Sequence, residues 1–121
     1  MQDKLELSLL LDYYGAFLTE ARREILSLSV DEDLSLGEIA EMKGISRQGV
    51  RDALQRGEAQ LYDMENKLGL VKRDMEITQL VSKLRHEIER AGVSDIQISR
   101  ILDRLTAVSY THLTLPTTAR V

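Results

Sequence analysis

The chain contains neither cysteine nor tryptophan, and Pro116 is the single proline among its 121 residues. Without cysteine it can form no disulfide, thiolate metal site or cysteine nucleophile, which fits a reducing cytoplasm. Aromatic residues make up only 4% of the chain, so leucine, isoleucine and alanine must fill the core. The start, Met1-Gln2-Asp3-Lys4, lacks the pattern of a secretory signal, and no apolar run is long enough to span a bilayer. We therefore expect a cytoplasmic protein without membrane insertion.

Among the residues that commonly carry catalysis or hold cofactors, the histidines are few and the numerous carboxylates are scattered on helix exteriors. His86 and His112 are the only histidines, and His86 lies among charged residues on the expected outer face of its helix. The acidic run 31–33 can be a cation site or an exposed connector, and we interpret it as a connector. No glycine-rich phosphate loop is present. We therefore expect a protein that is not an enzyme and has no catalytic residue, metal or cofactor.

Helical spacing of the apolar residues predicts an all-α bundle of about six helices. N-cap residues and glycines indicate where these helices begin and end. The expected segments are 3–17, a second helix after Thr19, 35–43, 46–68, 72–90 and a last helix opened by a capping box at 94–97. We expect a single all-helical domain over residues 1–107, with the C-terminal helices at 72–106. Apolar stripes on the first helix and along Leu54, Leu61 and Leu68 favour a homodimer.

Residues 108–121 differ in composition from the rest of the chain. This segment contains no acidic residue, is rich in threonine, and alternates polar and apolar residues over 109–115 like a strand. The run from Val108 to Thr117 also resembles the translation of a transposase sequencing-library adapter. We therefore interpret 108–121 as a non-native tail and leave it out of functional reasoning. A genuine flexible tail is the alternative.

The segment from Leu36 to Gln55 has the residue pattern of a helix-turn-helix unit, and we place the whole unit at 35–56. A small residue at Ala40 lets the second helix cross closely over the first, and Gly44 can take a positive φ in the tight turn. Four apolar residues are expected to fill the wedge between the two helices: Ile39, Ile45, Val50 and Leu54. The combined pattern is far more specific than any one of these residues.

The second helix of this unit would enter a major groove by its N-terminal end. Arginine can bond a guanine edge, glutamine an adenine edge, and serine a phosphate. The candidate nucleic-acid-binding residues are Lys43, Ser46, Arg47, Gln48, Arg51, Gln55 and Arg56. The net charge of −4 opposes strong DNA binding, and near the motif four cationic residues face Glu38, Glu41 and Asp52. We expect Asp52 to pair with Arg56.

Three stretches of the chain together resemble the YlxM family of bacterial helix-turn-helix proteins. They are Leu11–Thr19, Glu32–Glu41 and Ile45–Val50, and the resemblance covers about residues 7–70. It implies a helix-turn-helix like that of sigma-factor region 4, without a wing, and a regulatory role linked to the signal recognition particle pathway. The chain departs from the family pattern at Gly49, where alanine is more common, and at Leu28-Ser29, where an aromatic pair is usual.

Two functions compete on this evidence. The first is a regulator that binds DNA, or RNA, through the candidate residues, with dimerisation compensating for the poor charge. The second is an adaptor that docks on the signal recognition particle GTPase or its RNA, with its acidic body against a basic protein or ribonucleoprotein surface. A purely structural helical assembly is a third and weaker alternative.

Overall fold

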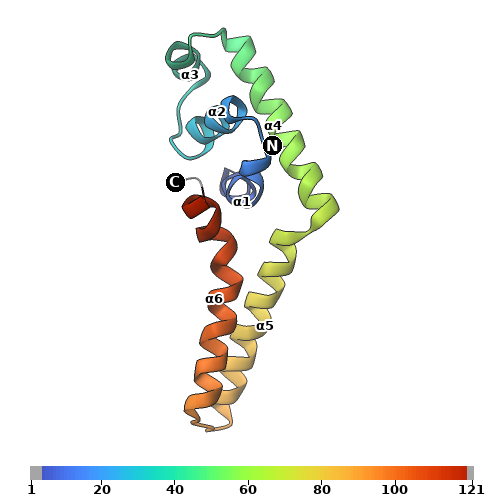
Figure 1. Cartoon of the computed structure of the whole chain (residues 1–121), viewed down its shortest axis with the longest axis vertical. Coiled ribbons are helices and arrows are strands. Elements are labelled where there is room, and N and C mark those ends of the chain that lie inside the picture. Colours follow the sequence, from blue (N-terminus) through green and yellow to red (C-terminus); the bar gives the residue numbers. More distant parts are fainter. Residues whose placement is uncertain (1–3, 120–121) are drawn as a thin grey trace. The chain divides into compact units, whose positions relative to one another are not determined.

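Residues 4–119 are described by a computed structural model, with side chains described to residue 108 in the last helix. They form six α-helices and one short 3₁₀ turn, and no strand occurs within this range (Figure 1). The helices are α1 (Lys4–Tyr14), α2 (Glu20–Val30), α3 (Leu36–Lys43), α4 (Arg47–Leu68), α5 (Leu70–Arg90) and α6 (Ile96–Ala119), with the 3₁₀ turn at Gly15–Phe17. The predicted all-α class is confirmed.

The chain divides into two compact units, Met1–Gly69 and Leu70–Val121, where the sequence predicted one domain over residues 1–107. Gly69 marks the boundary with a φ of 62°. This left-handed conformation suits glycine and ends α4, while its N–H bonds to the Glu65 carbonyl. The boundary at Gly69 therefore separates α4 from α5, which follow each other directly in the sequence.

The predicted helix starts in the first unit are confirmed by their capping bonds. Thr19 accepts a hydrogen bond from the Arg22 N–H, and Ser46 accepts one from the Gly49 N–H. Ser35 forms a full capping box with Glu38, in which each side chain bonds the other residue's backbone. These bonds satisfy amides that the first turn of a helix would otherwise leave unpaired.

The capping box predicted at Ser94 is wrong by one residue. The last helix begins at Ile96, and Asp95 Oδ1 accepts the Gln97 N–H at 2.7 Å. The Asp95 carbonyl also accepts the Ser99 N–H, as the residue before a helix does. Aspartate and serine are about equally good N-caps, so the sequence offered two adjacent choices.

The first unit encloses a core shared by all four of its helices. The stripe on α1 is buried at Leu7, Leu10, Leu11 and Tyr14. Leu61 on α4 is also fully buried. Most of the apolar surface that favoured a homodimer in the sequence is therefore used inside this unit.

The acidic run 31–33 forms the connector between α2 and α3. Asp33 has a φ of 57° and forms an ion pair with Lys4, which holds the pKa of this carboxyl below its usual value. Asp31 accepts hydrogen bonds from Ser8 and Ser27. The connector thus links the start of α1 to the end of α2.

The second unit is an antiparallel hairpin of α5 and α6 (Figure 1). Val81 and Leu102 are buried, and Arg85 bonds Asp103 across the hairpin at 3.2 Å. Gly92, with a φ of 73°, follows the end of α5, as predicted. The backbone of α6 stays helical to Ala119, so the alternation over 109–115 does not form a strand.

Candidate nucleic-acid interface

α3, the Gly44 turn and α4 form the predicted helix-turn-helix. Gly44 has a φ of 66°, and the Ala40 carbonyl accepts the N–H groups of both Gly44 and Ile45. Ile39 and Val50 are fully buried between the helices, and Leu54 packs against them. The chain therefore turns sharply here, and α4 crosses over α3 with its first turns exposed on the outer side.

The prediction for Ile45 is wrong, because this side chain does not fill the wedge. It is 43% exposed, and its Cδ1 lies 3.7 Å from the point where a Cβ on Gly49 would stand. Ile45 therefore lies over the first turn of α4. Leu28, Leu34 and Leu36 complete the packing around the wedge instead.

Three of the predicted residues share one exposed face of α4. Gln48, Arg51 and Gln55 are all exposed, and their spacing of three and four residues places them one above another on the helix. This face lies opposite the buried side of α4, which holds Val50 and Gly57. It offers hydrogen-bond donors and acceptors suited to base edges in a major groove.

Ser46 and Arg47 stand at the start of α4 and have partial engagements within the fold. The Ser46 oxygen accepts the Gly49 N–H at 3.0 Å, which leaves its hydroxyl hydrogen to donate to a phosphate. Arg47 is exposed, but its guanidinium lies against α3, where Nη2 would stand 3.0 Å from a Cβ on Gly37. This contact orients Arg47 toward the first turn of α3.

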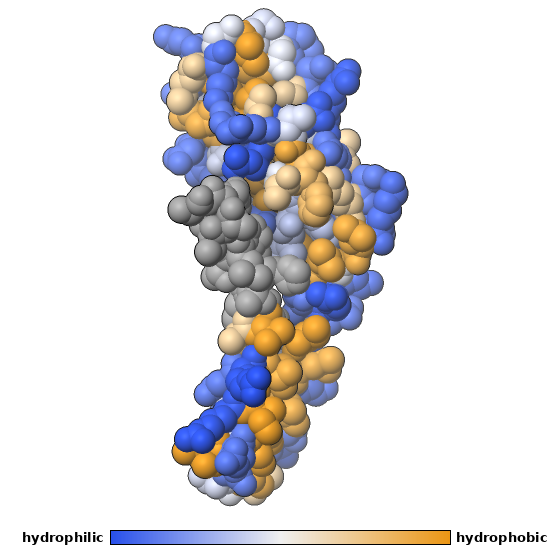
Figure 2. All heavy atoms as spheres, in the orientation of Figure 1, coloured by the Kyte–Doolittle hydropathy of each residue, from blue (hydrophilic) through white to orange (hydrophobic). Residues whose placement is uncertain are grey.

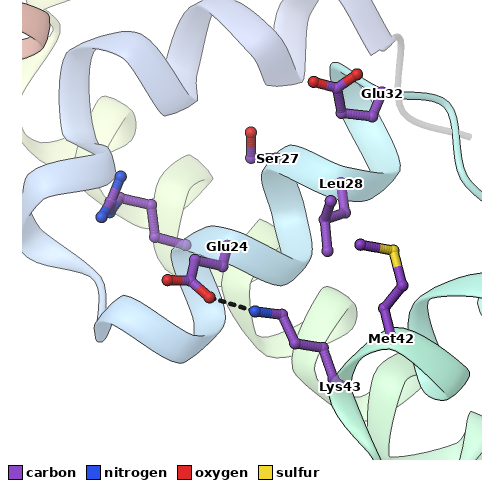
Figure 3. Close-up of a pocket in the computed structure, with 7 residues that line it drawn as sticks. Glu24, Ser27, Leu28, Glu32, Met42 and Lys43 are labelled. Carbon is purple, nitrogen blue, oxygen red and sulfur yellow. Dashed lines mark hydrogen bonds and ion pairs between the residues drawn. The ribbon is translucent and has the colours of Figure 1, made fainter.

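The two outer cations of the predicted set are paired within the fold. Lys43 bonds Glu24 of α2, and this hydrogen bond, together with the lysine charge, lowers the pKa of that carboxyl (Figure 3). Arg56 pairs with Asp52 at 3.2 Å, as the sequence predicted. Arg47 and Arg51 belong to no ion pair within residues 4–108. The interface therefore has fewer available positive charges than its sequence indicates.

A shallow hollow of about 260 Å³ lies between α2 and α3 beside the Lys43–Glu24 pair. Figure 3 shows Leu28 and Met42 on its apolar side, and Glu32 at another part of its rim. Because its lining mixes both charges with two apolar side chains, the hollow matches no single ligand class.

Two residues with a clear effect on this interface were missed by sequence reasoning. Glu24 removes a positive charge from it, and Gly37 gives room to the Arg47 guanidinium. Both act from elements outside α4, and only the tertiary packing brings them there.

Across residues 4–108, no three His, Asp or Glu side chains come together as a metal site would need. None of the helices in the described part of the chain is long and apolar enough to cross a membrane.

Comparison with known proteins identifies the family. Residues 1–101 match the model of the UPF0122 family, described as "Putative helix-turn-helix protein, YlxM / p13 like". A UPF0122 protein of Thermoanaerobacter sp. (strain X514) is 46% identical over 105 residues, covering 85% of this chain and 90% of the relative. One from Acetivibrio thermocellus is 42% identical over 107 residues, covering 87% and 92%. With the helix-turn-helix formed by α3 and α4, these matches show that the chain belongs to the UPF0122 family of YlxM / p13-like helix-turn-helix proteins.

Proposed function

We propose that this protein is a non-enzymatic regulator that binds duplex DNA through the exposed face of α4. The observation that carries the proposal is the alignment of Gln48, Arg51 and Gln55 on that face, directly after a helix-turn-helix turn. Ser46 would donate to a phosphate, and Arg47 would reach one after leaving its contact at Gly37. RNA remains the alternative nucleic acid.

Charge sets the expected strength of this binding. Phosphate contacts supply much of the affinity of DNA-binding proteins, and the chain has a net charge of −4. With Lys43 and Arg56 paired internally, one unit offers Arg47 and Arg51 as its main cationic contacts. We therefore expect a single chain to bind weakly. Its affinity should depend only shallowly on salt, with a slope near −2 for the logarithm of the binding constant against the logarithm of salt concentration.

Fluorescence anisotropy with the full chain and random duplex DNA tests the proposal. The wild type should bind at low salt and lose affinity as salt rises. Arg47→Ala/Arg51→Ala should lose most of this binding. The matched control is Lys67→Ala/Arg90→Ala, which removes the same charge outside α3 and the start of α4 and should bind like the wild type. Equal losses of DNA affinity in both variants would mean that only overall charge matters, and would refute specific DNA contacts by α4.

A second function is favoured by the same ion pairs that weaken the first. Because the exposed surface is acidic and two interface cations are neutralised, a basic protein or ribonucleoprotein surface is a suitable partner. The candidate is an adaptor that docks on the signal recognition particle GTPase or its RNA. Absence of duplex binding, together with binding to that GTPase or RNA that survives Arg47→Ala/Arg51→Ala, would support the adaptor.

A further inference from the structure

The α5–α6 hairpin leaves four large aliphatic side chains outside its own contact. Leu80 and Leu84 on α5 are 65% and 50% exposed, and Ile101 and Leu105 on α6 are 58% and 40% exposed. Figure 2 shows hydrophobic side chains gathered along this hairpin. We name these four residues the hairpin stripe.

The four residues of the hairpin stripe lie on one side of the hairpin. Val81 and Leu102 are buried between the two helices and mark the direction in which each helix faces the other. On each helix the exposed pair stands one residue before and three residues after the buried one. In an antiparallel pair of helices, the same offset from the facing residue places both exposed pairs on the same side. The stripe is therefore one continuous apolar surface.

We propose that the hairpin stripe is an interface for a second copy of this chain, which would pair two hairpins into a four-helix bundle. Two helices alone cannot enclose a core, whereas four can. The proposal does not depend on nucleic-acid binding. It also moves the homodimer contact away from α1 and α4, whose apolar residues serve largely the core of the first unit.

The area of the stripe agrees with what a dimer needs. Its four side chains expose on the order of 400 Å² per chain, which is as large as the biggest apolar patch on a typical monomer. Two chains would cover about 800 Å² of apolar surface. Since interfaces are about 60% apolar, the total of roughly 1,300 Å² falls within the standard range for specific complexes.

The surroundings of the stripe suit a second copy in shape and charge. A hollow of about 240 Å³, lined by Ile101, Arg104, Leu105 and Val108, lies along α6 and can receive a leucine side chain. The stripe itself supplies such side chains on α5, so one surface offers both the projection and the hollow. The edge of the stripe also carries charges of both signs. Glu76 and Lys83 lie beside Leu80, and Arg104 lies beside Ile101. A two-fold axis can set α5 of one copy against α6 of the other, as a self-complementary surface requires.

Sedimentation velocity of the full chain over a range of concentrations tests this inference. We expect the mass of two chains at micromolar concentration. Leu80→Glu/Ile101→Glu should give the mass of one chain, because it places two charges in the interface. The matched control is Ser82→Glu/Ser99→Glu, which adds the same charges at exposed positions away from the stripe on the same helices and should stay dimeric.

Circular dichroism checks that each variant keeps its helices. Should the glutamate variant unfold, Leu80→Asn/Ile101→Asn removes the apolar surface without adding charge, and its dissociation constant should rise at least tenfold. A wild type with the mass of one chain at ~100 µM would overturn the proposal and would leave the stripe as a surface for another protein. A dimer that neither stripe variant weakens would also overturn it.

Discussion

Leu26 of α2 lies directly over Gly57 of α4, so closely that a Cβ at position 57 would stand 2.5 Å from the leucine Cδ1. Leu26 is fully buried, and Gly57 is buried beside it. The absence of a side chain at position 57 lets these two helices approach each other at the centre of the first unit. In sequence alone this glycine only weakens a long helix.

Gly57→Ala should therefore destabilise the protein, although alanine favours helices. Crowding against Leu26 and the Arg22 Cγ should cost about 1–3 kcal/mol and outweigh the gain in helix propensity of ~1 kcal/mol, leaving a net loss of up to about 2 kcal/mol. Urea unfolding followed by circular dichroism measures this change. Gly49→Ala is the control, because its nearest neighbours stand at 3.3 Å or more, and it should leave stability unchanged or raise it. Similar behaviour of the two variants would contradict the crowding at Gly57.

Tyr14→Phe should destabilise the first unit by about 1–2 kcal/mol, because the Tyr14 hydroxyl donates to Glu65 Oε1 at 2.6 Å. Tyr14 is fully buried, so its hydroxyl has no access to water as a replacement partner. The loss is best measured as the change in the free energy of unfolding in urea. Glu65→Gln retains an acceptor at this position and should cost less than Tyr14→Phe, and a larger cost would refute this assignment.

Ser46→Ala and Ser35→Ala form a matched pair that separates capping from ligand binding. Each removes one capping bond and should cost ~1 kcal/mol in stability. Only Ser46→Ala should also weaken binding to duplex DNA, because its hydroxyl lies at the proposed interface. Thermal unfolding and fluorescence anisotropy measure the two effects. An equal loss of affinity in both variants would indicate that helix stability, not a phosphate contact, is responsible.

Glu24→Gln should strengthen DNA binding, because it releases Lys43 from its ion pair beside the interface. An affinity gain of about two- to tenfold at low salt is expected for one added phosphate contact, with a steeper salt dependence. Glu6→Gln makes the same change in net charge at an exposed position on α1 and should give a smaller gain. If the two variants behave alike, Lys43 does not act at the interface.

Glu58→Gln should stabilise the protein at neutral pH. Burial raises the pKa of Glu58 above its ordinary value of 4.5 in the folded state, so the folded protein favours the protonated form. The protonated Glu58 carboxyl therefore contributes stability that is fully present below the unfolded-state pKa of this residue. That contribution is lost as pH rises through its folded-state pKa. The gain from glutamine should therefore appear above about pH 5 and vanish near pH 3 in thermal unfolding. Glu89→Gln controls for the change in net charge, and an advantage that is equal at both pH values would contradict this account.

The parts of the fold that depend on local interactions could be predicted from the sequence. The capping box at Ser35 and the turn at Gly44 follow from short-range bonds that the sequence encodes directly. Ser94 and Asp95 show the limit, because two adjacent residues were both suitable caps. The ion pair of Lys43 with Glu24 joins two helices and depends on their crossing, so the pattern around Lys43 could not reveal it. The same holds for Arg47, whose neighbour at Gly37 lies ten residues away.

The 22 residues of α4 form a rod about 33 Å long that is held along its length. Its first three turns carry the exposed face, its middle is held by the bond from Arg22 to Gln60 at 3.0 Å, and its end by the bond from Tyr14 to Glu65. No part of this surface has to fold when a ligand arrives, so the binding enthalpy should change little with temperature. A large negative change in heat capacity on binding would then indicate that apolar surface is buried elsewhere in the chain. Calorimetry can thus distinguish binding through α4 from binding through the hairpin.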